Sequence, residues 1–311
     1  MLKVVLGQQR VQIGERFAVS FQRTLRIPDD GRSYPLPPGL GTFPLFRVQD
    51  YLDQVPEQWQ QQGGFLIPMH QREALWLGFS AAAWKPNAVK VAVGGVNAIT
   101  GEPDDNILRD PQNYIVCPPQ LWLDGIHTQQ EVVRQFVAMP LGQGYTVEAS
   151  VTGAETVGGI QLVVFEPKPG RFPEAPPEAP DAVMRSASPA GFGQMGLGAG
   201  GAIQQKIYPD PYDIDTWDQS NYGRTVIHLV NSSEFEAITK LPMPPTPIDA
   251  KTYTEYGLPW FELYDETADS LPSNELLNQV RTITETDAER GEVIQDESFE
   301  VSKSQIEKLE F

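Results

Sequence analysis

The chain of 311 residues is 40% hydrophobic and carries 41 acidic against 23 basic side chains, a formal net charge of −18. It is long enough for one large or two modest hydrophobic cores, and its acidity argues against binding to nucleic acid or to anionic membrane surfaces, both of which attract Lys and Arg. The sequence has no apolar run near the roughly 20 residues that cross a bilayer, and its N-terminus turns polar too early for a signal peptide. We therefore expect no membrane insertion and a protein that is cytoplasmic, or exported without a recognisable leader.

Six segments within residues 1–165 predict β-strands, because they are apolar or alternating and are bounded by Gly or Pro. The clearest alternation is in "YTVEASVT", where Tyr145, Val147 and Val151 share one face. A short connection leads from this segment to the next, so the two should form an antiparallel hairpin. The six predicted strands are 64–69, 74–80, 88–93, 134–139, 145–152 and 159–166. Their spacing favours a mostly β protein whose residues 1–165 form an antiparallel β-sandwich of the jelly-roll kind.

Residues 166–201 are rich in Pro, Ala, Gly and Glu, which predicts a linker or a long crossing. Its last part, "GFGQMGLGAGG", fits the dinucleotide fingerprint G-x-G-x-x-G twice, through Gly191, Gly193 and Gly196 and through Gly196, Gly198 and Gly201. A phosphate loop requires a strand before these glycines and a helix after them, and neither flank has that pattern. We expect a flexible crossing or a segment of close backbone packing.

Residues 202–286 predict a smaller β/α part that packs on the sandwich. "TVIHLV" from Thr225 is apolar on both faces, as in a central strand, and Ser232 or Ser233 can cap a following short helix. Gly257 and Pro259 stop any helix here and expose "LPWFELY" as an apolar strip. An exposed apolar strip is typical of a contact with a protein partner or of self-association, and the predicted binding residues are Trp260, Phe261, Leu263 and Tyr264.

The C-terminal residues are strongly acidic. From Glu262 to Phe311 there are 14 acidic and 4 basic side chains, so this part carries a charge of −10. Such a composition is typical of a solvated tail. We assign residues 287–311 to an acidic tail.

One stretch predicts a thiol enzyme. "CPPQLWLDGIH" places Cys117, Asp124 and His127 near one another in the sequence, and a catalytic thiol requires a base together with a group that orients it. The alternative is that Cys117, which ends an apolar run, is a small buried hydrophobic side chain. Because Cys117 is the one cysteine, an internal disulfide is excluded.

A metal site is the third functional hypothesis, after the binding module and the thiol enzyme. The three histidines form no close ligand pair of the kind that zinc favours, and we expect no cofactor. The alternative is calcium, since "DPYDIDTWD" gathers Asp210, Asp213, Asp215 and Asp218 in a turn-rich stretch. The glycine and glutamate positions do not match an EF-hand, and acidic surface turns are common without metal.

Four stretches, "LWLDG", "VRQFVAMPLGQGYTVEASVTGAETVGGIQ", "PDPYDIDTWD" and "GLPWFELYDE", are together similar to a group of uncharacterised bacterial proteins. Shorter fungal relatives of that group span mainly residues 63–164. The resemblance implies that residues 1–165 form one module. It implies no activity, cofactor or site residue.

These observations favour a non-enzymatic binding or assembly module that acts through a protein partner or self-association. Two alternatives stay open. One is a thiol-dependent enzyme that uses Cys117, His127 and Asp124, and the other is a calcium-supported carbohydrate-binding protein that uses the acidic stretch and exposed tryptophans.

Overall fold

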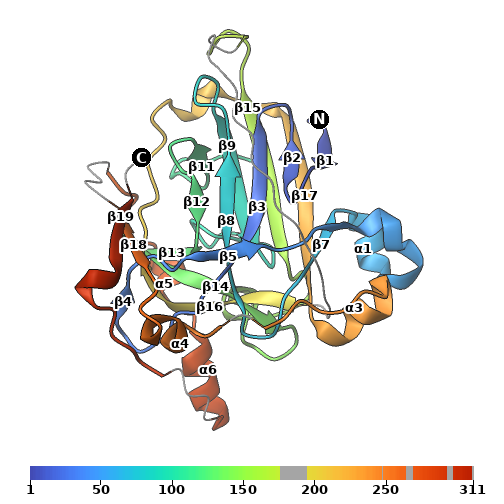
Figure 1. Cartoon of the computed structure of the whole chain (residues 1–311). Coiled ribbons are helices and arrows are strands. Elements are labelled where there is room, and N and C mark those ends of the chain that lie inside the picture. Colours follow the sequence, from blue (N-terminus) through green and yellow to red (C-terminus); the bar gives the residue numbers. More distant parts are fainter. Residues whose placement is uncertain (176–194, 247, 264–268, 293–296, 310–311) are drawn as a thin grey trace.

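The computed structural model describes residues 1–175, 195–246, 248–263, 269–292 and 297–309. Strands make up 37% of the chain and helices 18%, which confirms the prediction of a mostly β protein. Nearly all strands belong to one large, predominantly antiparallel sheet, which curves so that its parts enclose a shared core (Figure 1). No described helix has the length and apolarity needed to span a bilayer.

Two groups of strands carry the main core. The first group is β17 (Trp217–Val230), β15 (Ile160–Pro167) and β9 (Asn87–Val93), with β11 (Ile115–Cys117) and β10 (Val96–Asn97) beyond β9. The second group is β1 (Val4–Leu6), β2 (Val11–Ile13), β3 (Phe17–Thr24) and β8 (Ala74–Ser80), extended by β5 (Gly39–Thr42) and β12 (Trp122–Leu123). Inward side chains from both groups, such as Val91 and Leu77, lie in one apolar core.

The remaining strands close the lower part of the sheet in Figure 1. They are β14 (Val132–Pro140), which pairs with β13 (Gly125–Gln129), β8 and β16 (Met195–Gln204), together with β4 (Ser33–Tyr34), β6 (Phe46–Arg47) and β7 (Phe65–Pro68). Five of the six strands predicted within residues 1–165 are therefore confirmed.

The sixth predicted strand, 145–152, is wrong, and so is the hairpin that depended on it. These residues contain the helix α2 (Val147–Thr152). The Thr146 hydroxyl accepts a hydrogen bond from the amide of Ala149 at 3.1 Å and caps the helix. The buried Glu148 carboxylate then accepts the amides of three successive residues, 156–158, at 2.7–2.9 Å. These polar contacts outweigh the local alternation.

The glycine-rich stretch is a buried strand rather than part of a linker. Residues 195–201 belong to β16, which pairs with β14 along nearly its whole length. A Cβ atom on Gly198 would lie 2.8 Å from the carbonyl oxygen of Tyr145, a distance that no side chain tolerates. Close backbone packing, the second of the two expectations, is the correct one here. Gly191 and Gly193 lie outside the described residues.

Three helical segments form a side layer at one end of the sheet, on the right of Figure 1. They are η1 (Val48–Gln54), α1 (Glu57–Gln62) and α3 (Ser232–Thr239), and they enclose a second apolar cluster around Trp59 and Phe235. The cap of α3 is Asn231, whose side chain accepts the amide of Ser233, one residue before the predicted cap.

The C-terminal part packs against the lower edge of the sheet. Its elements are α4 (Ala250–Glu255), β18 (Trp260–Leu263), α5 (Glu275–Asn278), α6 (Ile283–Arg290), η3 (Lys303–Gln305) and β19 (Ile306–Leu309), and a further short helix, η2 (Ile214–Thr216), precedes β17. The predicted boundary at 287 falls inside α6, where Asp287 is buried. Further along, β19 pairs in parallel with β18, and Phe299 packs between the rings of Tyr34 and Trp260. Among the described residues from 287 on, Asp287 and Phe299 are buried and most of the others are exposed, so the solvated character of this part stays a prediction.

Candidate ligand-binding cleft

The predicted thiol site is buried. Cys117 ends β11 with no exposed surface, and burial raises the pKa of its thiol well above the usual value. A nucleophilic cysteine requires the opposite, an accessible thiol with a lowered pKa. Asp124 and His127 are buried as well. The structure thus supports the alternative, a cysteine that fills the core.

All three histidines bind backbone carbonyl oxygens. Their Nε2 atoms lie 2.9 Å from the carbonyl oxygens of distant residues, His70 from Pro244, His127 from Pro272 and His228 from Gly63. Burial lowers the pKa of His127 and lowers that of His228 to about 4. These hydrogen bonds fasten irregular segments to the sheet.

Asp124 joins two distant segments through the Gln205 amide. The Asp124 amide donates to Gln205 Oε1 at 2.9 Å, and Gln205 Nε2 donates to the Asp124 carboxylate at 2.9 Å. Burial raises the pKa of Asp124 to about 7. Its role is therefore structural, and it makes stability depend on pH.

We expect Asp124→Asn to be more stable than the wild type at about pH 8 and equally stable near pH 4. The folded-state pKa of about 7 lies above the ordinary value of 3.8, so between these values the native state binds more protons than the unfolded state. The Asp124 contribution to the free energy of unfolding therefore falls as pH rises through that window. Melting temperatures across the window test this, with the exposed Asp213→Asn as control; a pH-independent difference between Asp124→Asn and the wild type contradicts it.

The four aspartates of the calcium hypothesis differ in their surroundings, and one of them, Asp213, is exposed. Asp210 accepts hydrogen bonds from the Tyr114 hydroxyl at 2.6 Å and from Trp217 Nε1 at 2.8 Å. The side chain of Asp215 is 85% exposed, and that of Asp218 accepts from Ser220. Within the described ranges, no three His, Cys, Asp or Glu side chains converge as metal ligands would. The calcium hypothesis gains no preformed cage from these residues.

Two of the predicted binding residues, Trp260 and Phe261, pack against the core. Trp260 is completely buried, and its Nε1 donates to the Thr254 hydroxyl at 3.1 Å. The backbone of Phe261 forms two hydrogen bonds with Leu36, at 2.9 and 3.1 Å. The Leu263 side chain and Tyr264 lie outside the described residues. Trp260 is thus an internal anchor, and an association through this region stays a prediction that would rest on the exposed Tyr256 and Leu258.

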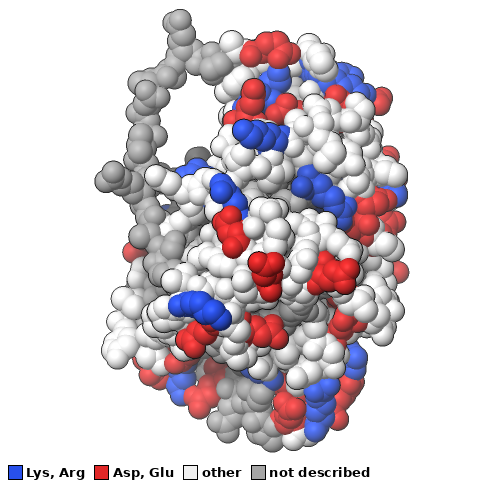
Figure 2. Space-filling view, turned by 90° about the vertical axis from the view of Figure 1, so that its right-hand side faces the viewer, with Lys and Arg blue, Asp and Glu red and all other residues white. Residues whose placement is uncertain are grey.

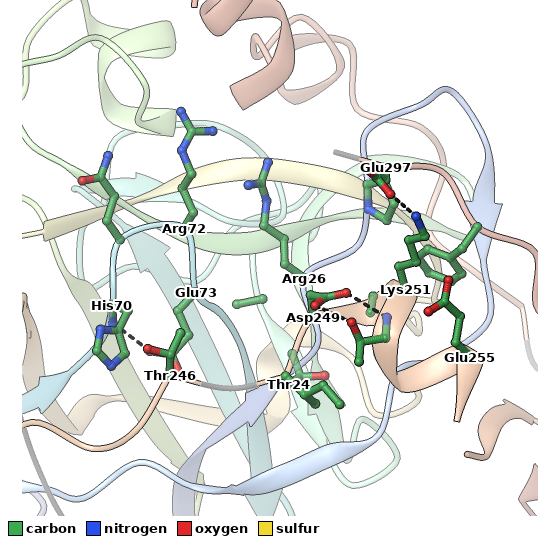
Figure 3. Close-up of a pocket in the computed structure, with 17 residues that line it drawn as sticks. Thr24, Arg26, His70, Arg72, Glu73, Thr246, Asp249, Lys251, Glu255 and Glu297 are labelled. Atoms are coloured by element: carbon green, nitrogen blue, oxygen red, sulfur yellow. Dashed lines mark hydrogen bonds and ion pairs between the residues drawn. The ribbon is translucent and has the colours of Figure 1, made fainter. Parts of the chain in front are cut away.

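A cleft of about 580 Å³ lies where the sheet meets the C-terminal part. Residues from four segments line it: 24–28 at the end of β3, 70–74 at the start of β8, 246 with 248–255 around α4, and residues 297 and 299 (Figure 3). Most of the labelled side chains are charged or polar. These four segments are far apart in the sequence, so the cleft exists only in the folded chain.

One wall is built on Glu73. Its carboxylate pairs with Arg23 and accepts the His70 amide at 2.7 Å. Burial raises the pKa of Glu73, although Arg23 opposes this effect. The His70 ring in turn holds the Pro244 carbonyl, which places the chain before α4 beside this turn.

Arg72 anchors α6 beside the cleft. Its Nη1 and Nη2 atoms donate to the two carboxylate oxygens of Asp287 at 2.9 and 2.7 Å, and the Tyr145 hydroxyl adds a third hydrogen bond at 2.7 Å. Burial acts to raise the pKa of Asp287, but hydrogen bonds from Arg72 and Tyr145 outweigh it and keep this pKa below the usual value. This bidentate geometry is the strong form of the Arg–carboxylate pair.

The opposite wall consists of α4 and the C-terminal segment. Asp249 caps α4 by accepting the Thr252 amide at 2.8 Å. Lys251 pairs with Glu297, and these two side chains are 44% and 51% exposed. Phe299 adds an apolar surface that the rings of Trp260 and Tyr34 support.

The sequence offered no signal for this cleft. His70 forms no close ligand pair with another histidine, and the charged residues of the 24–28, 70–74 and 248–255 segments have no motif spacing. Asp249 was detectable only as a helix cap, three residues before Thr252.

No protein-family model matches the chain, and neither a curated protein nor a solved structure matches it significantly.

Proposed function

We propose that this chain is a non-enzymatic binding protein that holds a polar ligand in the cleft between the sheet and α4. The observation that carries the proposal is the cleft itself. Its volume of about 580 Å³ falls within the range of pockets that enclose small ligands, and several polar groups converge on it from four segments.

Binding is favoured over catalysis because the lining groups are already committed to protein partners. Thr24 donates its hydroxyl to the Pro38 carbonyl and Thr252 donates to Asp249. Glu73 is held by Arg23 and the His70 amide. Groups held this firmly are suited to recognise a ligand with fixed geometry rather than to exchange protons or form a covalent bond.

The face of the molecule shown in Figure 2 favours a local binding site over a broad electrostatic surface. On the face shown in Figure 2, acidic and basic side chains are interspersed rather than gathered into a patch of one sign. The large negative net charge is therefore not concentrated on this face as a docking surface for a polycation.

A blocking variant tests the proposal. Thr246 lines the cleft and is exposed, so Thr246→Trp is expected to fill the cleft without disturbing the core. We expect the wild type to gain thermal stability with at least one class from a panel of amino acids, peptides, sugars, nucleotides and organic acids, because a ligand that binds only the native state stabilises it. Thr246→Trp should abolish that gain.

The matched control is Gln62→Trp, which adds the same bulk at the exposed end of α1, outside the cleft lining. This variant should respond to the ligand like the wild type. A panel with no effect on the wild type, or a stabilisation that persists in Thr246→Trp, would contradict the proposal.

A further inference from the structure

We infer that the cleft takes a neutral saccharide, an inference that rests on the proposed binding function. The charged side chains that line the cleft are, with one exposed exception, already held by partners within the chain. A charged ligand gains little here, because it would have to displace one of these partners or leave its own charge unpaired. A neutral ligand with many hydroxyl groups avoids both costs. This site differs from the 210–218 stretch, to which the calcium hypothesis assigned a carbohydrate.

The three cations of the described lining are held by carboxylates. Arg72 donates two hydrogen bonds to Asp287, at 2.9 and 2.7 Å, and Arg26 adds a weaker electrostatic attraction to the same carboxylate. Lys251 pairs with Glu297. A phosphate or a ligand carboxylate would therefore compete with a carboxylate of the chain at each of these cations.

The carboxylates of the lining are held in a similar way, apart from one. Glu73 is paired with Arg23, and Asp249 accepts the amide and the hydroxyl of Thr252, at 2.8 and 2.7 Å. The exception is Glu255, which is exposed in the last residue of α4. A cationic ligand gains little from it, because charges surrounded by water attract each other only weakly.

Hydroxyl groups suit a lining of paired charges because each can donate and accept at the same time. A sugar hydroxyl can accept from the Lys251 ammonium group while it donates to the Glu297 carboxylate, so the pair stays intact. These two side chains are 44% and 51% exposed, and Figure 3 shows them on one side of the cleft with Thr246 on the other. Thr246 and Gln71 are exposed lining residues that add a neutral hydroxyl and a neutral amide.

The apolar part of the lining suits the C–H face of a sugar ring better than a nucleobase or a large apolar side chain. Phe299 is 9% exposed and Ala250 is 5% exposed, so these residues open little apolar surface to a ligand. The Phe299 ring packs on Trp260 at 5.3 Å between ring centroids. A small, fixed aromatic surface can contact ring hydrogens, whereas stacking of a flat base requires a broad aromatic face.

The test compares sugars that share one ring and differ in charge. Isothermal titration of the full chain uses glucose, galactose and mannose, each beside its cationic amino sugar and its anionic uronate. We expect at least one neutral sugar to bind, and to bind at least about tenfold more tightly than both of its charged relatives.

Two variants locate the sugar in the cleft. Thr246→Trp should abolish binding, and Gln71→Ala should weaken it at least about threefold, as expected for the loss of one hydrogen bond. Gln62→Ala is the matched control, because it removes the same amide from an exposed position of α1 outside the cleft lining. This control should bind the neutral sugar like the wild type.

The outcomes separate this inference from the binding function. If the charged relatives bind as tightly as the neutral sugar, if Gln71→Ala has no effect, or if only another class of ligand binds in a way that Thr246→Trp abolishes, the neutral saccharide is wrong and the cleft remains a binding site. If no compound binds to the wild type, or if all binding persists in Thr246→Trp, both proposals fail together. A neutral sugar that Thr246→Trp and Gln71→Ala weaken, and Gln62→Ala does not, supports both.

Discussion

Replacing Gly201 with alanine is expected to lower the free energy of unfolding by roughly 3 kcal/mol or more, because the new methyl group enters space filled by backbone. A Cβ at this position would lie 2.3 Å from the carbonyl oxygen of Pro28 and 2.8 Å from that of Ile27. The clashing atoms are backbone carbonyl oxygens, which cannot move aside as the end of a flexible side chain can. The strain would also displace the 24–28 segment, which lines the cleft.

Urea unfolding measures this effect, and Gly39→Ala is the matched control. Gly39 also lies in a strand, β5, but the nearest atom to its added Cβ would be a Trp76 ring carbon at 3.5 Å, an ordinary contact distance. We expect the control to stay within about 1 kcal/mol of the wild type. Equal stabilities for the two variants would show that β16 does not need the close approach of residue 201.

The strands that the sequence predicted correctly are those with a strong local pattern. The segments 74–80, 88–93 and 159–166 are short, apolar and bounded by turn residues, and they became β8, β9 and β15. Such a pattern survives folding because a central strand needs only apolar side chains on the faces that the sheet buries.

The secondary-structure predictions failed where a few polar or backbone contacts outweigh the local sequence pattern. The alternation in 145–152 yielded to the Thr146 cap and to the Glu148 carboxylate. The composition of 195–201 indicates flexibility, yet its glycines allow β16 to approach neighbouring backbone. In the first case single oxygen atoms of Thr146 and Glu148 decide the local structure. In the second case the neighbouring backbone is distant in the sequence. Hydrophobic periodicity reveals neither kind of contact.

The cleft was beyond sequence reasoning for a related reason. Arg72 meets Asp287, 215 positions away, and Lys251 meets Glu297, 46 positions away. Each is an ordinary charged residue in its local sequence, and only the topology brings them to one place. Trp260 was predicted to contact a protein partner, and in the structure its indole is buried and donates to Thr254 of the same chain.

Replacing Trp260 with alanine is expected to release the C-terminal segment 297–309 while leaving the large sheet folded. The indole is completely buried, bonded to Thr254, and packed on Phe299 at 5.3 Å. Removing a buried Trp side chain typically costs about 3–5 kcal/mol. The loss should be local because β18 and β19 form a small sheet of their own, separate from the large one. Faster hydrogen exchange in 297–309 and faster tryptic cleavage at Lys303 would report the release.

Tyr256→Ala is the control, since this side chain lies four residues away and is 72% exposed; it should leave exchange and cleavage unchanged. Because Glu297 and Phe299 line the cleft, release of the segment in Trp260→Ala should also weaken any ligand that Thr246→Trp excludes. If Trp260→Ala instead changes the oligomeric state while 297–309 stays protected, the strip acts at an interface between chains and the internal anchor is wrong. If the segment is released and ligand affinity is unchanged, the C-terminal wall contributes no binding energy, and recognition depends on the 24–28 and 70–74 segments and on α4.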